Sequence, residues 1–408
     1  MRVLVLTESF PTPANPARGV FIRRQIEALS LHHSVTVLFP RPFIPLIPTL
    51  WLESAANALD TATIGQYQTA VEVRCPKYLY VPRLRGVRIR QLARIVRRTL
   101  LNAKRPYDLV HAHWMSPAGM AAVKGATGLN IPVVVTAHAG DVYRDLNRAK
   151  FARVAAQLVH QASKIIGTAE YFREVLVQLG TAPAKMKIIP NGVDTRIFVP
   201  AERDKARMEL GLPTGVPLYL YLGDLKKAKG AMDVVEAFFA YASSPSVLVI
   251  AGSGELWGQF ARRAASSEGR FILRGLQSHD NVARYLAAAD CFVLASYAEG
   301  NPVTVLESLC CGTPVIGSSI PPIASLIQEG GNGLLFPVGD LPALGQAMRR
   351  LLTVPWDRTA IAQRAVARYG WPTVSARISD VYTEALTEVR AEGRLRVDAV
   401  NELNEPWP

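Results

Sequence analysis

The sequence lacks the features that mark secreted, disulfide-bonded or membrane-spanning proteins. It has only four cysteines in 408 residues, and their spacing fits no metal-ligand pattern, so neither a zinc site nor a disulfide framework is expected. The opening residues, MRVLVLTESF, hold too short an apolar run for the core of a signal peptide. The longest uncharged run, Ser308 to Gln328, is interrupted by prolines and small turn residues, which argues against a membrane span. We therefore expect a cytoplasmic protein, bound at most peripherally at the inner face of a membrane.

Acidic residues are scarce in the first half of the chain. Residues 1–190 hold 25 Lys and Arg against 10 Asp and Glu, whereas residues 191–408 hold 21 against 23. The net charge of +13 therefore belongs to the first half. From Arg74 to Arg105 there are eleven basic residues and no acidic one. This imbalance predicts an anionic partner for the first half of the chain.

The basic segment 74–105 contains an amphipathic helical pattern. Ile89, Leu92 and Leu100 share one helical face, while most of the arginines fall elsewhere. Such a helix suits an anionic membrane surface, and the apolar stretch Pro42–Leu52 could add an anchor. Two alternatives stay open at this point. One is a helix packed on a sheet with a solvated basic back. The other, a nucleic-acid surface, is disfavoured because aromatic residues are few and no binding motif is present.

Short apolar runs alternate with helical patterns along nearly the whole chain. Continuous rather than alternating apolar residues predict parallel strands that are buried on both faces. Turn residues interrupt the pattern near Pro190–Pro200, which predicts an α/β protein with two doubly wound domains. The predicted strands are Val3–Leu6, Val35–Phe39, Leu109–Ala112, Val133–Thr136 and Ile165–Gly167 in the first domain, and Leu218–Leu222, Val247–Ala251, Phe271–Leu273, Cys291–Leu294 and Val315–Ile316 in the second.

Chemically distinctive residues follow several predicted strands, where open parallel sheets bind their ligands. Gly19 ends a loop rich in proline and glycine, and His138 and Asp141 follow a buried strand of the first domain. Gly223 and Lys229 follow the first strand of the second domain. Glycine lets backbone N–H groups approach a phosphate, and lysine can neutralise a diphosphate leaving group. Taken singly, a loop lysine is usually a solvated charge, and a lone histidine usually packs or caps.

Two glutamates, Glu299 and Glu307, stand eight residues apart around a short apolar segment. Asn301 as N-cap, Pro302 at the first helical position and Gly312 just past the end predict a helix here. The free N–H groups at the start of this helix would then lie beside Glu299 and form a binding site for an anion. The arrangement predicts a ligand that carries both phosphates and hydroxyls.

The order of these motifs resembles the large family-4 group of retaining glycosyltransferases. The resemblance covers residues 1–385 and is most specific over residues 290–337, where Glu299 and Glu307 match the E-x7-E motif of that family. It implies the GT-B architecture, in which two Rossmann-like doubly wound domains face each other across a cleft. The implied parts are an acceptor-binding domain over 1–190, a nucleotide-sugar-binding domain over 191–370, a helix over 371–388 that crosses back to the first domain, and a loosely held tail over 389–408.

The resemblance also implies roles for individual residues. Glu307 would hold the ribose hydroxyls of a nucleotide diphosphate sugar, Glu299 the hydroxyls of the sugar, and Lys229 the diphosphate as the glycosidic bond breaks. A carboxylate accepts two hydroxyl hydrogen bonds at once, which suits both a ribose and a hexose. The implied catalytic residues are Lys229, His138 and Glu299; the donor-binding residues are Gly19, Gly223, Lys229, Glu299, Gly300, Asn301, Val303, Thr304 and Glu307; His138 and Asp141 would face the acceptor.

Members of this family need no metal ion, and the chain contains no Asp-x-Asp sequence. The resemblance implies retention by front-face attack, in which the leaving phosphate takes the acceptor proton. Two positions depart from the family pattern. Ser325 stands where a glutamate is common, and Asp224 stands where an arginine usually clamps the diphosphate. Asp224 must therefore face away from the phosphate or pair with a neighbour. Lys226 or Lys227 is a candidate to replace the lost positive charge.

We expect a retaining hexosyltransferase that takes a sugar from a nucleotide diphosphate sugar. This donor is a substrate, and no cofactor is expected. The expected acceptor is lipid-linked, a glycan or phosphate-bearing, and no nucleic acid is expected as a partner. Two alternatives are a non-catalytic protein that binds or scaffolds around a sugar nucleotide, and a GT-B-type sugar-nucleotide epimerase.

Overall fold

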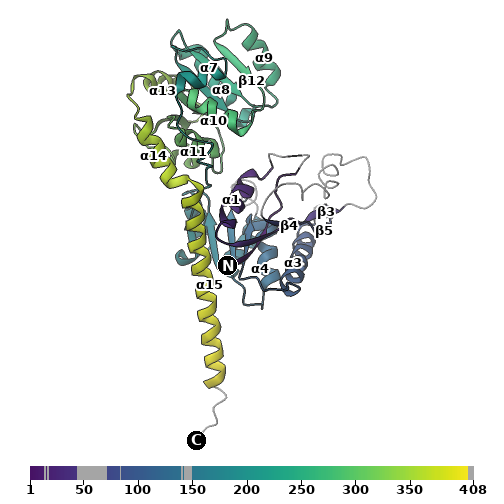
Figure 1. The fold of residues 1–408 in the computed structure, drawn as a ribbon. Coiled ribbons are helices and arrows are strands. Elements are labelled where there is room, and N and C mark those ends of the chain that lie inside the picture. Colours follow the sequence, from purple (N-terminus) through teal and green to yellow (C-terminus); the bar gives the residue numbers. More distant parts are fainter. Residues whose placement is uncertain are drawn as a thin grey trace. The chain divides into compact units, whose positions relative to one another are not determined.

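A computed structural model gives the fold and describes residues 1–12, 15, 18–43, 71–82, 84–138, 141 and 149–402. The chain divides into two compact units (Figure 1). The N-terminal unit comprises Met1–Pro190 together with Val374–Pro408, and the C-terminal unit comprises Asn191–Thr373. Each unit contains a parallel sheet of its own, so the predicted fold class, two Rossmann-like α/β domains, is confirmed.

The N-terminal unit is built around a sheet of seven strands in the order β4-β2-β1-β6-β7-β8-β9, and every neighbouring pair is parallel. Val3 through Leu6 of β1 are fully buried, as a strand covered on both faces requires. The strands are β1 (Arg2–Leu6), β2 (Ser34–Leu38), β4 (Glu72–Arg74), β6 (Leu109–His113), β7 (Val133–Ala137), β8 (Lys164–Gly167) and β9 (Met186–Ile188), and a separate small sheet pairs β3 (Arg41–Phe43) with β5 (Lys77–Leu79).

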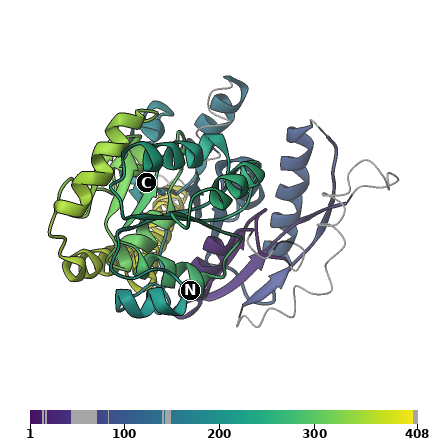
Figure 2. The same ribbon diagram turned by 90° about the horizontal axis from the view of Figure 1, so that it is seen from above.

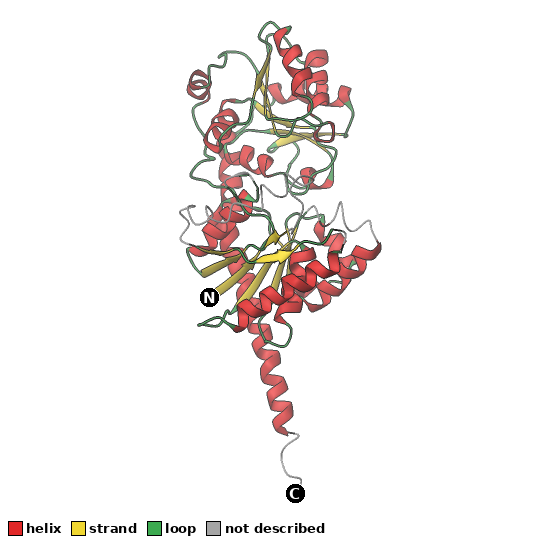
Figure 3. Ribbon diagram, turned by 90° about the vertical axis from the view of Figure 1, so that its right-hand side faces the viewer, coloured by secondary structure: helices red, strands yellow, loops and turns green. Residues whose placement is uncertain are grey.

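Helices cover both faces of this sheet (Figure 3). The long helix α15 belongs to the N-terminal unit from Val374 onward and extends past the expected end at 388 to Glu402. It is held to the sheet by Tyr382, which is fully buried, and by the buried Lys164 on β8, whose Nζ donates to Glu388 at 2.7 Å. The helices of the unit are α1 (Val20–Ser30), α3 (Arg85–Leu101), α4 (Met120–Ala126), α5 (Ala149–Gln161), α6 (Phe172–Gln178) and α15 (Trp371–Glu402).

The basic helix α3 packs against α4 (Figures 1 and 2). Its apolar residues, among them Leu92 and Val96, are buried in the core of the unit. The expectation that this apolar face meets a membrane is therefore wrong, because the face already contributes hydrophobic stabilisation inside the protein. Arg94 and Arg98 remain exposed on the other side. The predicted anchor Pro42–Leu52 lies outside the described residues beyond Phe43, and no helix in the described ranges is long and apolar enough to cross a bilayer.

The C-terminal unit contains six parallel strands in the order β12-β11-β10-β13-β14-β15. Numbered along the chain, this is the order 3-2-1-4-5-6 of dinucleotide-binding domains, and it reverses between β10 and β13. The strands are β10 (Leu218–Leu222), β11 (Val247–Ala251), β12 (Phe271–Arg274), β13 (Cys291–Leu294), β14 (Val315–Ser318) and β15 (Gly333–Phe336). The helices are α7 (Arg203–Glu209), α8 (Ala231–Tyr241), α9 (Trp257–Ala265), α10 (His279–Ala288), α11 (Val303–Cys310), α12 (Pro321–Ala324), α13 (Leu341–Thr353) and α14 (Arg358–Tyr369).

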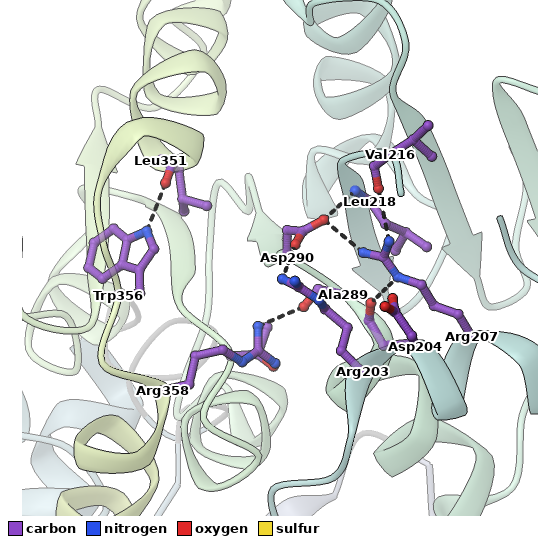
Figure 4. Close-up of polar contacts among 12 residues, drawn as sticks. Arg203, Asp204, Arg207, Val216, Leu218, Ala289, Asp290, Leu351, Trp356 and Arg358 are labelled. Atoms are coloured by element: carbon purple, nitrogen blue, oxygen red, sulfur yellow. Dashed lines mark hydrogen bonds and ion pairs between the residues drawn. The ribbon is translucent and has the colours of Figure 1, made fainter. Parts of the chain in front are cut away.

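A cluster of three arginines and one aspartate closes the end of this sheet at which β10 and β13 begin (Figure 4). Asp290 accepts hydrogen bonds from Leu218 N at 2.7 Å and from Arg207 at 2.8 Å, and it also pairs with Arg203. Arg358 donates to two backbone carbonyls at 2.8 and 3.2 Å. These bonds join helices to strand starts, so the cluster stabilises the end of the sheet opposite to the one where ligands of such domains bind.

Candidate functional site

The C-terminal unit places the predicted donor-binding residues where its strand order reverses. The segment Gly223–Gly230 follows β10, and the segment Ala295–Pro302 follows β13, the neighbouring strand. Doubly wound domains bind their ligands at this position, beyond the carboxyl ends of the strands. The predicted residues of this unit therefore come together at the edge of the sheet where a ligand is expected.

Gly230 allows the two loops to approach each other. Its backbone φ is +64°, and a Cβ atom there would lie 2.0 Å from the carbonyl oxygen of Ala295. Only glycine fits such a position without strain. The contact, together with a hydrogen bond of 3.1 Å from Tyr297 N to Ala228 O, brings Lys229 next to the loop after β13. No role was predicted for Gly230, although its position between the lysine-rich loop and a helix is visible in the sequence.

Replacing Gly230 with alanine should lower the free energy of unfolding by about 2–5 kcal/mol. The new methyl group would combine left-handed backbone strain with overlap against a carbonyl that cannot move freely. Gly258 in α9 is the matched control, because nothing lies within 4 Å of the place that a methyl group would take there and its φ is not positive. Gly258→Ala should leave stability unchanged or raise it by about 0.5–1 kcal/mol. Urea unfolding measures both changes, and wild-type stability in Gly230→Ala would contradict the close approach.

Lys229 and Glu299 form an ion pair where the two loops meet. Lys229 Nζ lies 2.8 Å from Glu299 Oε1, and Ser296 Oγ donates to the same oxygen at 2.8 Å. The glutamate side chain is 13% exposed and the lysine side chain 33%. Among the described residues, the second carboxylate oxygen of Glu299 accepts no hydrogen bond. One oxygen is thus held in place while the other can accept a bond from a ligand hydroxyl.

Helix α11 begins at Val303, and Pro302 is its N-cap. The prediction of Asn301 as N-cap and of Pro302 as the first helical residue is wrong by one residue, because Pro302 has a ψ of 91°, outside the helical region. No side chain caps the helix and no acidic residue lies in its first turn, so its N–H groups present a partial positive charge. Gly300 and Thr304 flank this helix start and are half-buried.

Glu307 lies inside α11 and is 7% exposed. Burial raises the pKa of Glu307 to about 8, since an ionised carboxylate is poorly solvated there. In the described part of the chain no group donates a hydrogen bond to this carboxyl group. A buried acid without a partner is costly to the fold, and such groups are concentrated at functional sites. The geometry fits a site in which a ligand supplies the missing hydroxyl donors.

Asp224, which replaces the usual arginine, is 56% exposed and pairs with Lys226 at 2.8 Å. The two opposite charges offset each other, so the pair adds no net charge to the loop. Gly223 has a φ of +150°. A Cβ atom on Gly252, in the loop after β11, would lie 1.9 Å from the carbonyl oxygen of Gly223. These glycines let the loops after β10 and β11 pack backbone against backbone.

The N-terminal unit gathers His138 and Asp141 after β7. Asp141 is buried, and its Oδ2 accepts hydrogen bonds from the backbone N–H groups of His138 and Met115, both at 3.0 Å. The carboxylate therefore ties the exit of β7 to the segment after the neighbouring strand β6. Its geometry is that of a residue that fixes the backbone around a site; a direct acceptor contact of Asp141 remains a prediction.

The side chain of His138 is uncharged at neutral pH, because burial lowers the pKa of His138 to about 3. Its Nε2 lies 3.1 Å from His113 Nδ1, and its ring packs against Phe21 and Trp114 with centroid separations of 5.3 and 4.8 Å. A neutral imidazole can donate or accept a hydrogen bond to a sugar hydroxyl without introducing a charge. Phe21 lies two residues after Gly19, so the start of α1 and His138 are close in this unit.

Two further histidines, for which the sequence analysis gave no role, extend this cluster. The ring of His111 stacks on His113 with a centroid separation of 4.6 Å, and His111 bonds to Tyr382 at 2.6 Å and to Thr136 at 2.8 Å. Burial lowers the pKa of His111 to about 3 and that of His113 well below its usual value. The alternating H-A-H at the end of β6 was the available signal, since residues two apart on a strand share a face.

Gly19 and Trp114 follow β1 and β6, the two strands between which the order of this sheet reverses. Gly19 is the N-cap of α1 with a φ of +66°, and a Cβ atom there would lie 2.6 Å from Ser9 O. Trp114 has a φ of +70°, which is rare for a bulky residue. The strained backbone at Trp114 lies where the sheet would bind a ligand, and strain of this kind is concentrated at ligand-binding sites.

Sequence profiles of two glycosyltransferase groups match most of the chain. The profile described as Glycosyltransferase Family 4 matches residues 19–197. The profile described as Glycosyl transferases group 1 matches residues 202–368. The two matches follow one another along the chain and include the residues assembled above in both units.

Curated relatives of this chain are named as glycosyltransferases. A protein of Bacillus subtilis (strain 168) named for teichuronic acid biosynthesis, the glycosyltransferase TuaC, is 30% identical over 357 residues, which cover 86% of this chain and 89% of the relative. The D-inositol 3-phosphate glycosyltransferase of Nocardiopsis dassonvillei is 29% identical over 311 residues, which cover 70% of this chain and 72% of that protein.

Solved structures share the fold at lower identity. Sucrose-phosphate synthase from Thermosynechococcus elongatus superimposes with a TM-score of 0.72 at 20% identity, over 95% of this chain and 100% of that chain. Anabaena HepE in complex with UDP superimposes with a TM-score of 0.69 at 19% identity, over 94% and 100%. By sequence and by fold, the chain belongs to family 4 of the glycosyltransferases and has the GT-B fold.

Proposed function

We propose that this glycosyltransferase takes its sugar from a nucleotide diphosphate sugar and transfers it with retention of the anomeric configuration. The observation that carries the proposal is the ion pair of Lys229 and Glu299 beside the uncapped start of α11, with the buried Glu307 on the same helix. The HepE structures with UDP and with UDP-glucose, which share the fold, support this class of donor. A diphosphate matches a lysine and a helix N-terminus, and two carboxyl groups match the hydroxyls on either side of it.

In this proposal Lys229 neutralises the diphosphate as the bond between the anomeric carbon and the phosphate oxygen breaks. The N–H groups at the start of α11, including those of Val303 and Thr304, stabilise the same developing charge. The acceptor oxygen bonds to the anomeric carbon from the face that the phosphate leaves, and the acceptor proton passes to the leaving phosphate. Glu299 holds a sugar hydroxyl through its second oxygen, and Glu307 holds the ribose.

The neutral His138 would act as a hydrogen-bonding contact to the transferred sugar. Its bond to His113 and its packing against Trp114 fix the orientation of the ring. With a pKa far below neutrality, His138 is not suited to supply a proton at physiological pH. A positioning role therefore fits it better than general acid catalysis.

The acceptor would bind to the N-terminal unit and carry negative charge. The names of the relatives, which refer to teichuronic acid and to inositol phosphate, are consistent with a glycan or phosphate-bearing acceptor. The exposed arginines of α3, among them Arg94 and Arg98, could in addition hold the protein at an anionic membrane surface by charge alone.

A thermal-shift screen against sugar nucleotides tests the donor class. The true donor should raise the melting temperature by about 5 °C when it is present at about 100 times its Kd, since it binds only the folded state. Glu307→Ala should remove most of that shift, whereas Glu236→Ala, which removes an exposed acid on α8, should keep it. The product anomer, read by NMR, should match that of the donor. No shift with any sugar nucleotide, or an inverted product, would contradict the proposal.

A further inference from the structure

The C-terminal unit contains a small pocket of about 170 Å³ at the end of the sheet where its strands begin. Two of its lining residues, Asp290 and Pro314, directly precede β13 and β14. The donor residues follow the carboxyl ends of the strands, so the pocket is separate from them. Its charged lining residues are Arg203, Asp290 and Arg358, which are drawn with Trp356 of its wall in Figure 4.

Asp290 is the only acid among the described residues that line the pocket, and both of its carboxylate oxygens are occupied. Oδ2 accepts hydrogen bonds from Leu218 N at 2.7 Å and from Arg207 at 2.8 Å. Oδ1 accepts a hydrogen bond from Arg203. The single negative charge of Asp290 is thus shared between two arginines, and none of it is left to balance a third.

Arg358 is a half-buried arginine without an acidic partner. It donates to Ala289 O at 2.8 Å and to Ala287 O at 3.2 Å. It also donates to Thr313 Oγ1 at 2.6 Å, and in the described part of the chain it forms no ion pair. Burial and the neighbouring charge of Arg203 lower the pKa of Arg358 to about 10, so the group still carries its charge at neutral pH. A buried charge without a counter-ion is costly to the fold.

The surroundings of Arg358 offset only part of its charge. The carbonyls that it contacts lie at the C-terminal end of α10, and a helix end contributes about half a negative charge. Of the nearby acids, Asp357 caps α14 and Glu202 caps α7, while Asp204 is exposed. Within the described ranges none of these three acids forms an ion pair with Arg358. The pocket therefore keeps an excess of positive charge.

Hydrogen-bond donors are available to a ligand in this pocket. Arg203 is 47% exposed, and among the described residues its guanidinium bonds only to Asp290, which uses one of its five N–H donors. The Nε of Arg358 takes part in no hydrogen bond with a described residue. The indole N–H of Trp356 is already bound to Leu351 O at 2.8 Å, so this residue contributes the surface of its ring. The volume lies below the range of about 300–1,000 Å³ for drug-sized ligands, which leaves room for a small ion but not for a nucleotide.

We propose that this pocket binds one phosphate group between Arg203 and Arg358, as a second anion site of the C-terminal unit. The inference goes beyond the proposed function, because the pocket lies at the opposite end of the sheet from Lys229. A bound phosphate gives Arg358 its missing counter-ion, and the planar forks of two arginines match the oxygens of a phosphate. The ligand is inorganic phosphate or the phosphate of a small monoester. Its binding links the start of α7 to the start of α14 and stabilises the folded unit.

Thermal unfolding of the full chain in inorganic phosphate, with ionic strength held constant by chloride, tests the pocket. The melting temperature of the wild type should rise with phosphate, and its concentration dependence gives an apparent Kd. Arg203→Gln and Arg358→Gln should each raise this Kd by about 10-fold or more, because a charge-assisted contact is lost. Arg262→Gln is the matched control, since it removes the same charge from an exposed position on α9 and should keep the wild-type Kd. Arg358→Gln also loses bonds to two carbonyls, so Arg203→Gln, at an exposed position, decides the question if Arg358→Gln does not fold.

Lys229→Ala separates this pocket from the donor residues and should keep the wild-type response to phosphate. A response that disappears in Lys229→Ala and is unchanged in Arg203→Gln would place the anion at the donor residues and overturn the inference. An equal rise in melting temperature with chloride alone, or a wild-type Kd in every pocket variant that folds, would also overturn it. A parallel titration with glycerol 3-phosphate distinguishes a phosphate ester from the free ion, and binding of either that depends on Arg203 supports the pocket.

Discussion

Replacing Lys229 with alanine should lower the turnover number by about 10²–10³-fold while weakening donor binding by less than about 10-fold. Negative charge on the diphosphate increases as the glycosidic bond breaks, so the lysine contributes more to the transition state than to the bound donor. In the structure its ammonium lies 2.8 Å from Glu299, which already holds it at the edge of the sheet. Steady-state rates and calorimetric Kd values for the donor separate the two effects.

Lys227→Ala is the matched control for this substitution. Lys227 lies two residues earlier in the same loop, is exposed and pairs with no acidic side chain in the described part of the chain. Its removal changes the net charge of the protein by the same amount as Lys229→Ala and should leave turnover near the wild-type value. Equal losses in both variants would mean that general charge, rather than the position of Lys229, assists the reaction.

Replacing Glu307 with glutamine should weaken binding of a sugar nucleotide by about 10–100-fold, because hydrogen bonds from two ribose hydroxyls to a charged acceptor are lost or reduced. The same substitution should also abolish the release of a proton that accompanies donor binding in the wild type. Near neutral pH the free protein holds a proton on Glu307, whose pKa is about 8. Two hydroxyl donors favour the ionised form, so donor binding lowers this pKa and expels the proton.

Calorimetry in buffers of different ionisation enthalpy measures the released proton directly. Wild-type protein and Glu236→Gln, a control at an exposed acid, should show a binding enthalpy that depends on the buffer. Glu307→Gln should show none. A buffer-independent enthalpy for the wild type would mean that Glu307 does not accept the ribose hydroxyls.

The raised pKa of Glu307 also determines whether the stability of the folded protein rises or falls with pH. Between its ordinary value of 4.5 and about 8, the folded protein holds a proton on Glu307 that the unfolded chain has released. The folded state binds more protons, so its stability falls as pH rises through this window. Relative to Glu307→Gln, the melting temperature of the wild type should therefore fall as pH rises from 4.5 to about 8. A constant difference would argue against burial of an uncompensated acid.

The sequence predicted the sheets well because parallel strands buried on both faces leave continuous apolar runs. β10, β11 and β13 begin and end as predicted. The short strand β15 was missed, because Gly333–Phe336 offers only four residues after a glycine-rich turn. Helix α3 was recognised as amphipathic, but periodicity alone cannot tell a core-facing apolar stripe from a membrane-facing one.

The candidate site was predictable only where spacing carries the information. The eight-residue separation of Glu299 and Glu307 is visible in the sequence, whereas the contact of Lys229 with Glu299 depends on strand order and on the missing side chain of Gly230. The contacts of Arg18 and Arg88 with Glu8 are also not visible in the sequence. Arg18 and Arg88 are 70 residues apart, and nothing local marks them as neighbours of Glu8.

The proposed function requires a sugar nucleotide to bind at the carboxyl end of the C-terminal sheet. Diffraction from crystals soaked with UDP-glucose tests it most directly. We expect density for the diphosphate at Lys229 and the first turn of α11, with the ribose against Glu307 and the hexose against Glu299. Density for the nucleotide at any other place, with these residues still in the free arrangement, would contradict it.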